Sequence, residues 1–260
     1  MKILSLLLPA LLASSAAAQV TVQVGPDPAP LGGPVFASVT NDTDLIMAIG
    51  GCPWRILDAS GGVVFTPTCI IQEFLVGSLG TINYRWDQVD QGGVQVAPGD
   101  YRFEVLTPGG AFDVPFAVAP TGGVTANLHL KGTPAIGTDQ IGFGGRPIAL
   151  SAPQSPQAVY WMAAAFGPGP GIATCGGVLP LANDALLATT LAGGVFTNGI
   201  GVLDADGYSE QPLLPIPEQA SLVGANLALA FGVLDLSQPC PVRDVSPALP
   251  LTIGPGAVPF

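Results

Sequence analysis

The fold of this chain is decided by stretches such as Arg55-Ile56-Leu57-Asp58-Ala59-Ser60-Gly61-Gly62-Val63-Val64-Phe65. Two apolar runs flank a turn of small and polar residues, and the adjacent glycines tolerate the positive φ angles that tight hairpins require. The stretch therefore predicts a β-hairpin with strands at residues 55–58 and 63–65.

Similar short runs, in which apolar and polar residues alternate, lie on both sides of this hairpin, and such alternation is typical of half-buried strands. In the N-terminal half we expect further strands at residues 20–24, 35–40, 45–49, 70–76, 81–86, 99–106 and 112–118. The turn at residues 41–44 is expected to join its two neighbouring strands into the first hairpin. About seven to nine short strands in about 100 residues predict an immunoglobulin-like β-sandwich over residues 19–118.

A breaker-rich segment at residues 119–125 is the best linker between two domains. Beyond it, strands are expected at residues 125–130, 147–151, 158–165, 177–181, 199–203, 220–231 and 248–253. This pattern predicts a second β-sandwich domain over residues 126–260, so the expected fold class is all-β, with two sandwiches in tandem.

Residues 183–192 fit two different structures. As a helix, the segment would begin at Asn183 or Asp184 and stop at Gly193. As an edge strand, it would use the β-branched Thr189 and Thr190.

The composition excludes several functions. Charged residues make up 10% of the 260 residues, and 18 acids against 7 bases give a net charge of −11. Such a chain lacks the basic surface that nucleic acid or an anionic membrane attracts. Glycine (35) and proline (27) are too frequent for long helices, and a single histidine leaves little for acid–base catalysis. We therefore expect neither an enzyme nor a nucleic-acid-binding protein.

The first 18 residues are typical of a secretory signal peptide. Lys2 gives a positive start, residues 3–12 are apolar, and the alanines at 16–18 form a small-residue cleavage site. The apolar stretch is about ten residues long, whereas a membrane-spanning helix needs roughly 20. The uncharged residues 147–183 do not suit a membrane span either, because glycine and proline interrupt them. We expect an exported chain, periplasmic or extracellular, with no membrane span.

The four cysteines are Cys52, Cys69, Cys175 and Cys240. An even number in an exported chain predicts two disulfides, for which three connectivities exist. If the chain divides near residue 120, only Cys52–Cys69 with Cys175–Cys240 keeps each bridge within one domain, and we expect that pairing. The alternative is a zinc site, but the chain has no C-x-x-C pair and only His129 to assist.

The sharpest candidate for a metal site is Asp204-Ala205-Asp206-Gly207-Tyr208-Ser209-Glu210. Two acids one residue apart before a glycine begin many calcium loops, so Asp204, Asp206 and Glu210 are candidate ligands. Tyr208 at the fifth position and Pro215 at the twelfth depart from such a loop. A hairpin turn with Asp-Gly at its tip explains the same residues. The sequence indicates no other cofactor, since it contains no glycine-rich nucleotide loop.

Tyr160 and Trp161, with Phe166, are the candidate ligand-contact residues, because such a cluster can stack on a sugar ring or on a partner's surface. The alternative is that alternate residues of a strand pack in the core. We assign no catalytic residue. His129 lies in a predicted strand, where we expect an outward-facing structural histidine.

Three segments of the N-terminal half follow a recognisable order: Thr40-Asn41-Asp42-Thr43-Asp44, then Asp58-Ala59-Ser60-Gly61-Gly62, and finally the stretch from Tyr84-Arg85-Trp86-Asp87-Gln88 to Val96-Ala97-Pro98-Gly99-Asp100-Tyr101. With them, residues 35–105 resemble the intracellular proteinase inhibitor-like domain, an immunoglobulin-type sandwich found in many exported bacterial proteins. The resemblance implies a fold far better than an activity. The C-terminal half resembles an uncharacterised β module of exported bacterial proteins, through stretches such as Leu203-Asp204-Ala205-Asp206-Gly207 and Leu214-Pro215-Ile216-Pro217.

Together these features predict an exported, non-catalytic binding or structural protein of the cell envelope or extracellular space. Its expected partner is a protein or glycan of the envelope. The alternative is an exported proteinase inhibitor that acts through the disulfide-held stretch at residues 53–68.

Overall fold

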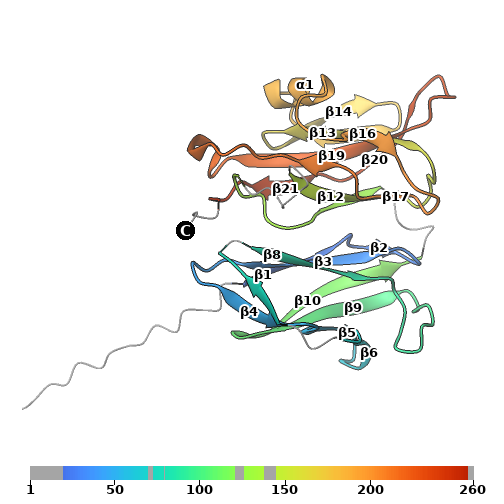
Figure 1. The fold of residues 1–260 in the computed structure, drawn as a ribbon. Coiled ribbons are helices and arrows are strands. Elements are labelled where there is room, and N and C mark those ends of the chain that lie inside the picture. The colour runs from blue at the N-terminus through green and yellow to red at the C-terminus, as the bar shows by residue number, and fades with distance from the viewer. Residues whose placement is uncertain (1–19, 70–72, 79, 121–125, 138–144, 257–260) are drawn as a thin grey trace, which may run out of the picture.

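The computed structural model describes residues 20–69, 73–78, 80–120, 126–137 and 145–256. These residues fold mostly into strands, which confirms the all-β class (Figure 1). The predicted signal peptide lies outside the described residues, as do residues 121–125 of the predicted linker, so both stay predictions.

Two sheets and a separate strand pair build the N-terminal half. The first sheet has the order β1 (Val20–Gly25), β3 (Val35–Asn41), β8 (Thr81–Trp86). The second has the order β2 (Ala29–Pro30), β10 (Gly110–Ala119), β9 (Gly99–Thr107), β5 (Trp54–Asp58), β6 (Val63–Phe65). Strand β4 (Met47–Gly50) pairs with β7 (Glu73–Val76).

Aromatic side chains fill the core of this half. The Trp54 and Phe103 rings stack with centroids 5.4 Å apart, and the Trp86 and Tyr101 rings are 5.7 Å apart. Because aromatic rings bury large apolar areas, these few residues account for much of the packing between the sheets.

The predicted 55–65 hairpin is confirmed. Strands β5 and β6 pair antiparallel, Gly61 has a φ of +87°, and the Asp58 carboxylate accepts a 2.8 Å hydrogen bond from the Gly62 N–H. The predicted first hairpin is wrong, because β3 pairs with β1 and β8 whereas β4 pairs with β7. The buried Asn41 explains why: its amide donates to the carbonyls of Leu45 (2.6 Å) and Val76 (3.0 Å), which makes residues 41–45 a crossing between sheets.

The C-terminal half again contains two main sheets. One consists of β11 (Asn127–Leu130), β12 (Arg146–Ser151) and β17 (Tyr208–Ser209), with β18 (Leu213–Leu214) also paired to β12. The other has the order β16 (Ile200–Val202), β13 (Val159–Ala165), β19 (Asn226–Leu234), β20 (Val242–Val245), with β21 (Leu249–Thr252) also paired to β19. A hairpin, β14 (Pro168–Thr174) with β15 (Gly177–Leu181), and the helix α1 (Ala185–Leu191) lie on the far side of β13 and β19 (Figure 1).

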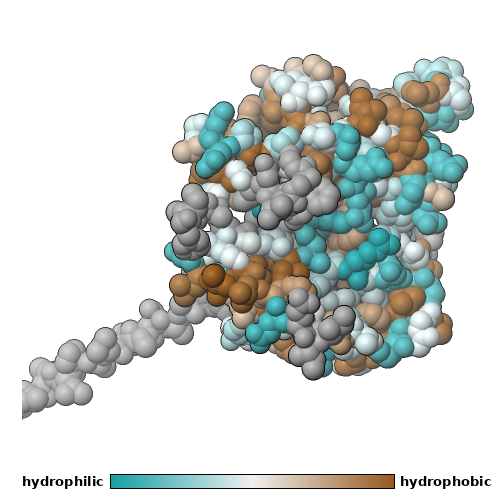
Figure 2. Space-filling model, viewed as in Figure 1, coloured by the Kyte–Doolittle hydropathy of each residue, from teal (hydrophilic) through white to brown (hydrophobic). Residues whose placement is uncertain are grey.

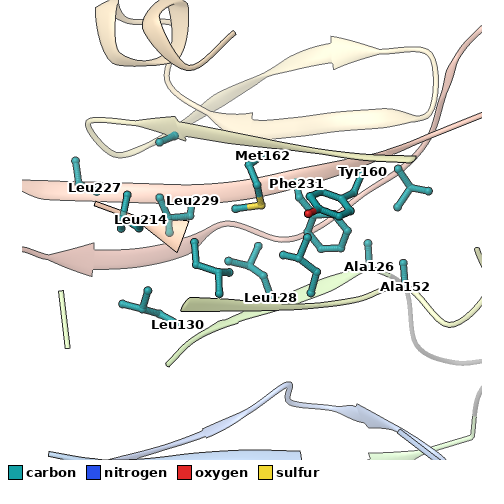
Figure 3. Packing of buried hydrophobic residues seen from close by; sticks show 14 of the residues in the cluster. Ala126, Leu128, Leu130, Ala152, Tyr160, Met162, Leu214, Leu227, Leu229 and Phe231 are labelled. Atoms are coloured by element: carbon teal, nitrogen blue, oxygen red, sulfur yellow. The ribbon is translucent and has the colours of Figure 1, made fainter. Parts of the chain in front are cut away.

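Strand β13 is buried on both faces. Tyr160, Met162 and Ala164 face the cluster between the two main sheets, in which Leu214 and Leu227 lie toward one end and Tyr160 toward the other (Figure 3). The intervening Ala163 and Ala165 face a second cluster, under α1 and the β14–β15 hairpin. Small side chains on that face let the third layer approach closely.

The structure decides between the two alternatives for residues 183–192 and corrects the predicted strand at 220–231. The segment at 183–192 is a helix, with Asp184 as its N-cap and Gly193 in a left-handed conformation (φ +84°) just beyond it. The predicted strand at 220–231 is a 3-10 turn, Ala220–Leu222, followed by β19. Strand β14 was not predicted, because its glycines and prolines resemble breakers; in a two-stranded sheet, prolines fit an edge position.

The two expected disulfides are present. Cys52 bonds to Cys69, 17 residues apart, and Cys175 bonds to Cys240, 65 residues apart. Such bonds indicate an oxidising compartment. Within the described residues, no helix is both long and apolar enough to cross a membrane.

The β1–β3–β8 sheet of the N-terminal half lies against the β11–β12–β17 sheet of the C-terminal half (Figure 1). The Gly132 N–H donates a 3.1 Å hydrogen bond to the Ser38 hydroxyl, and the Lys131 ammonium lies 4.1 Å from the centre of the Phe36 ring. All seven side chains of β3 are consequently buried, alternately in the core of their own half and against the other half.

Candidate functional site

A pocket of about 580 Å3 opens in the C-terminal half. Its walls include Ala164 and Phe166 at the end of β13, Leu186 on α1, residues 214–218, and Leu227 on β19. Leu214 and Leu227 also belong to the main core cluster, so the pocket extends outward from the end of the core that they occupy (Figure 3). Ligand pockets commonly measure about 300–1,000 Å3 and are lined mainly by apolar side chains, and this one matches both features.

Asp184 holds one wall of this pocket in place. One of its carboxylate oxygens accepts a 3.0 Å hydrogen bond from the Leu187 N–H, which caps α1, and the other accepts a 2.8 Å bond from the Phe166 N–H. A short polar side chain at the N-cap satisfies donors that the helix cannot pair itself. The same residue thereby fixes Phe166, at the end of β13, relative to Leu186, in the first turn of α1.

The opposite wall is the segment Leu214-Pro215-Ile216-Pro217-Glu218. Leu214 and Ile216 are buried, and the two prolines that follow them restrict the backbone of the segment. The Gly137 N–H donates a 3.0 Å hydrogen bond to the Ile216 carbonyl, and Gly137 takes a φ of +60° that favours glycine. The segment is therefore held as a preformed wall.

Glu218 is the one titratable side chain among the described residues that line the pocket. It is exposed, and its Cβ and Cγ lie close to Gly137, where an added Cβ would come within 3.2 Å of both. The pocket thus combines apolar walls with a single carboxylate at its solvent-facing side.

The aromatic residues singled out in the sequence do not form one cluster. Tyr160 is fully buried and its hydroxyl donates a 3.1 Å hydrogen bond to the Asn198 carbonyl, which favours the alternative that this residue packs in the core. Trp161 points to the other face of β13, with its ring where a side chain at Gly232 would lie, and it lines a smaller hollow of about 270 Å3. Phe166, 57% exposed, lines the larger pocket.

The geometry of residues 204–210 favours the hairpin-turn alternative over a calcium loop. The Asp204 carboxylate accepts hydrogen bonds from the Asp206 N–H (3.0 Å) and the Tyr208 N–H (2.8 Å), as in a hairpin turn. Glu210 pairs with Lys131, which follows β11 in the same half, and its other carboxylate oxygen lies 3.7 Å from the Arg85 guanidinium of the N-terminal half. Across the described residues, no three acids, histidines or cysteines are grouped to hold a metal ion.

His129 is buried rather than outward-facing, because the N-terminal half covers its strand. Its ring packs against Gly25, where an added Cβ would lie 2.6 Å from Nδ1, and its Nε2 has no hydrogen-bond partner in the described part of the chain. Burial, with a smaller contribution from the Lys131 charge, lowers the pKa of His129 to about 4. A neutral, enclosed imidazole has no access to a substrate.

Half of the stretch at residues 53–68, considered above as an inhibitory loop, lies in strands β5 and β6. Trp54, Ile56 and Leu57 are buried in β5, and β6 follows directly after the turn. Only the turn at 59–62 and the residues before Cys69 project from the sheet as connecting segments.

Exposed apolar side chains also occur outside the pocket. Figure 2 shows hydrophobic areas over both halves of the molecule. In the N-terminal half, Leu45, Ile46 and Leu75 are each more than 60% exposed, around the β4–β7 pair.

Comparisons with known proteins identify no family. No known family matches the sequence, and no curated protein does. Among solved structures, an alkylpurine DNA glycosylase of Pseudomonas fluorescens bound to DNA is 16% identical over 40% of this chain and 31% of its own, with a TM-score of 0.28. Red sea bream transglutaminase is 8% identical over 92% of this chain and 32% of its own, with a TM-score of 0.30. A mutant Salmonella alpha-2-macroglobulin is 13% identical over 92% of this chain and 15% of its own, with a TM-score of 0.27.

This chain therefore spans between 15% and 32% of the length of these three proteins. Similarities with TM-scores of 0.30 or less carry no argument about fold or activity. The function has to be argued from the pocket itself.

Proposed function

We propose that the protein is an exported, non-catalytic binding protein that holds an apolar ligand in the pocket between α1 and residues 214–218. The observation that carries this proposal is the pocket: about 580 Å3, walled by apolar side chains from distant parts of the sequence, and held by Asp184 and Gly137. Sites with these properties bind small apolar ligands, because burial of apolar surface drives the association.

Three features support action outside the cytoplasm, in the envelope or the extracellular space. The sequence begins with a segment typical of a signal peptide, the two disulfides suit an oxidising compartment, and the charge of −11 gives no basic surface for nucleic acid. We further propose that residues 19–118 are an immunoglobulin-like domain of the type that the family resemblance implies. That domain would act as a support for the ligand-binding half.

A binding role fits the chemistry of the pocket better than a catalytic one. Glu218 has no second titratable group beside it among the described lining residues, whereas acid–base chemistry needs matched proton donors and acceptors. The proteinase-inhibitor alternative gains no support from residues 53–68, since half of that stretch forms strands β5 and β6 of a five-stranded sheet.

The proposal is tested with Nile red, a neutral dye whose fluorescence rises in apolar surroundings, titrated against the purified chain. We expect saturable binding at one site, weakened several-fold by Phe166→Ala. The matched control is Leu191→Ala, since both side chains are 57% exposed but Leu191 lies outside the pocket. Absence of saturable binding, or equal weakening by both variants, would overturn the proposal.

A further inference from the structure

We infer that the pocket prefers an apolar ligand with a positively charged head group, such as a long-chain amine, over one with a carboxylate. The inference rests on the proposed function and adds the chemical class of the ligand. It depends on the position of Glu218 and on where the basic residues of the chain lie.

Glu218 is placed to meet the head group of a ligand whose apolar part fills the pocket. The preceding Pro217 restricts the backbone, and the Gln219 N–H donates a 2.8 Å hydrogen bond to the Pro217 carbonyl. On the other side, the Glu218 stem lies against Gly137, which has no side chain to displace it. The carboxylate therefore stays at the solvent-facing side of apolar walls, where an ammonium group can remain hydrated while it pairs.

Glu218 makes no ion pair within the described residues, and none of the described residues that line the pocket is basic. Most basic side chains are engaged elsewhere: Arg55 with Glu104, Arg85 with Asp87, Arg102 with Asp113, and Lys131 with Glu210. A carboxylate ligand would thus find no cation in the pocket.

The charge of the whole chain acts in the same direction. A net charge of −11 repels an anionic ligand and attracts a cationic one, an effect that falls as salt screens the field. A neutral head group gains no affinity from Glu218 or from the net charge of the chain. The expected order of affinity is amine, then alcohol, then carboxylate.

The test uses decylamine, decanol and decanoate, which share one alkyl chain and differ in the charge of the head group at pH 7. Each competes with Nile red for the full chain. We expect decylamine to bind about tenfold more tightly than decanoate at low salt. Glu218→Gln should weaken decylamine binding by about two- to fivefold, the range for an exposed ion pair, and leave decanol unchanged. Glu73→Gln, which removes the same charge from the exposed surface of β7, is the control and should change none of the affinities.

Each other outcome is informative. Equal affinities for the three compounds, or tighter binding of decanoate, would overturn the inference while the proposed function stands. An equal effect of Glu73→Gln and Glu218→Gln would show that net charge, not Glu218, sets the preference, which also overturns it. If Nile red binds but none of the compounds displaces it, the inference alone is overturned; if Nile red itself shows no saturable binding, the proposed function falls together with the inference.

Discussion

Lowering the pH from 7 to 4 should destabilise the folded protein by about 3 kcal/mol through His129 alone. The imidazole is buried between the two halves, and burial, with a smaller contribution from Lys131, lowers its pKa from 6.5 to about 4. In the unfolded chain it accepts a proton near pH 6.5, whereas the folded protein accepts one only near pH 4. Between these values the unfolded state binds more protons, so stability falls as the pH falls.

The magnitude follows from the gap between the two pKa values. Each pH unit corresponds to about 1.36 kcal/mol, so the gap from 6.5 to about 4 gives about 3 kcal/mol. The penalty is nil above about pH 6.5 and complete below about pH 4. Against a typical total stability of about 5–15 kcal/mol, this is a large effect for one side chain.

Urea unfolding of the wild type and of His129→Gln, at a series of pH values, measures the effect. The wild type should lose about 3 kcal/mol more than the variant between pH 7 and pH 4. Subtracting the variant removes the contributions of carboxylates such as Asp58 and Asp235, whose pKa values are lowered by hydrogen bonds from Ser60 and Ser237.

Since His129 is the single histidine of the chain, its imidazole resonance can also be titrated directly by NMR. A resonance that titrates near pH 6.5 in the folded protein would refute the reasoning. So would parallel pH dependences of wild type and variant.

Three further predictions follow from other features. Replacing Cys175 and Cys240 by serine should lower the free energy of unfolding by about 4 kcal/mol in urea titrations under oxidising conditions, because the bridge closes a loop of 65 residues. Asp184→Ala should cost about 1 kcal/mol and lower the affinity for Nile red, because the carboxylate both caps α1 and holds the N–H of Phe166; an unchanged affinity would contradict this structural link. EDTA should leave the melting temperature unchanged, because the Asp204 carboxylate already accepts hydrogen bonds within its turn and Glu210 already pairs with Lys131; a drop would support the calcium hypothesis.

Local patterns in the sequence were sufficient for features that depend on neighbouring residues. The 55–65 hairpin and most strand positions follow from alternation and turn glycines, whereas the helix that begins after Asp184 was one of two alternatives for its segment. The pairing partners of the strands were harder to predict, because pairing depends on the arrangement of the whole sheet. Asn41 belongs to a turn-like stretch, yet its side chain reaches Val76, 35 residues away.

The pocket could not be predicted, because its walls come from segments far apart in the sequence. Asp184 links the end of β13 to α1, and Ile216 meets Gly137 by a hydrogen bond across the fold. The one local signal was the alternation of proline with apolar residues at 214–217, which indicates a restrained, half-buried segment. Tyr160 and Trp161 do not form one surface, because adjacent residues on a strand point to opposite faces.

The burial of β3 on both sides affects how the protein can be divided. Separate expression of residues 20–120 would leave Phe36 and Ser38 facing water, and separate expression of the remainder would do the same to His129. Neither half is therefore an interchangeable building block. A hybrid that joins the N-terminal half to a different partner domain would have to supply a matching sheet surface, with a small residue opposite Ser38 and a hydrogen-bond donor to its hydroxyl.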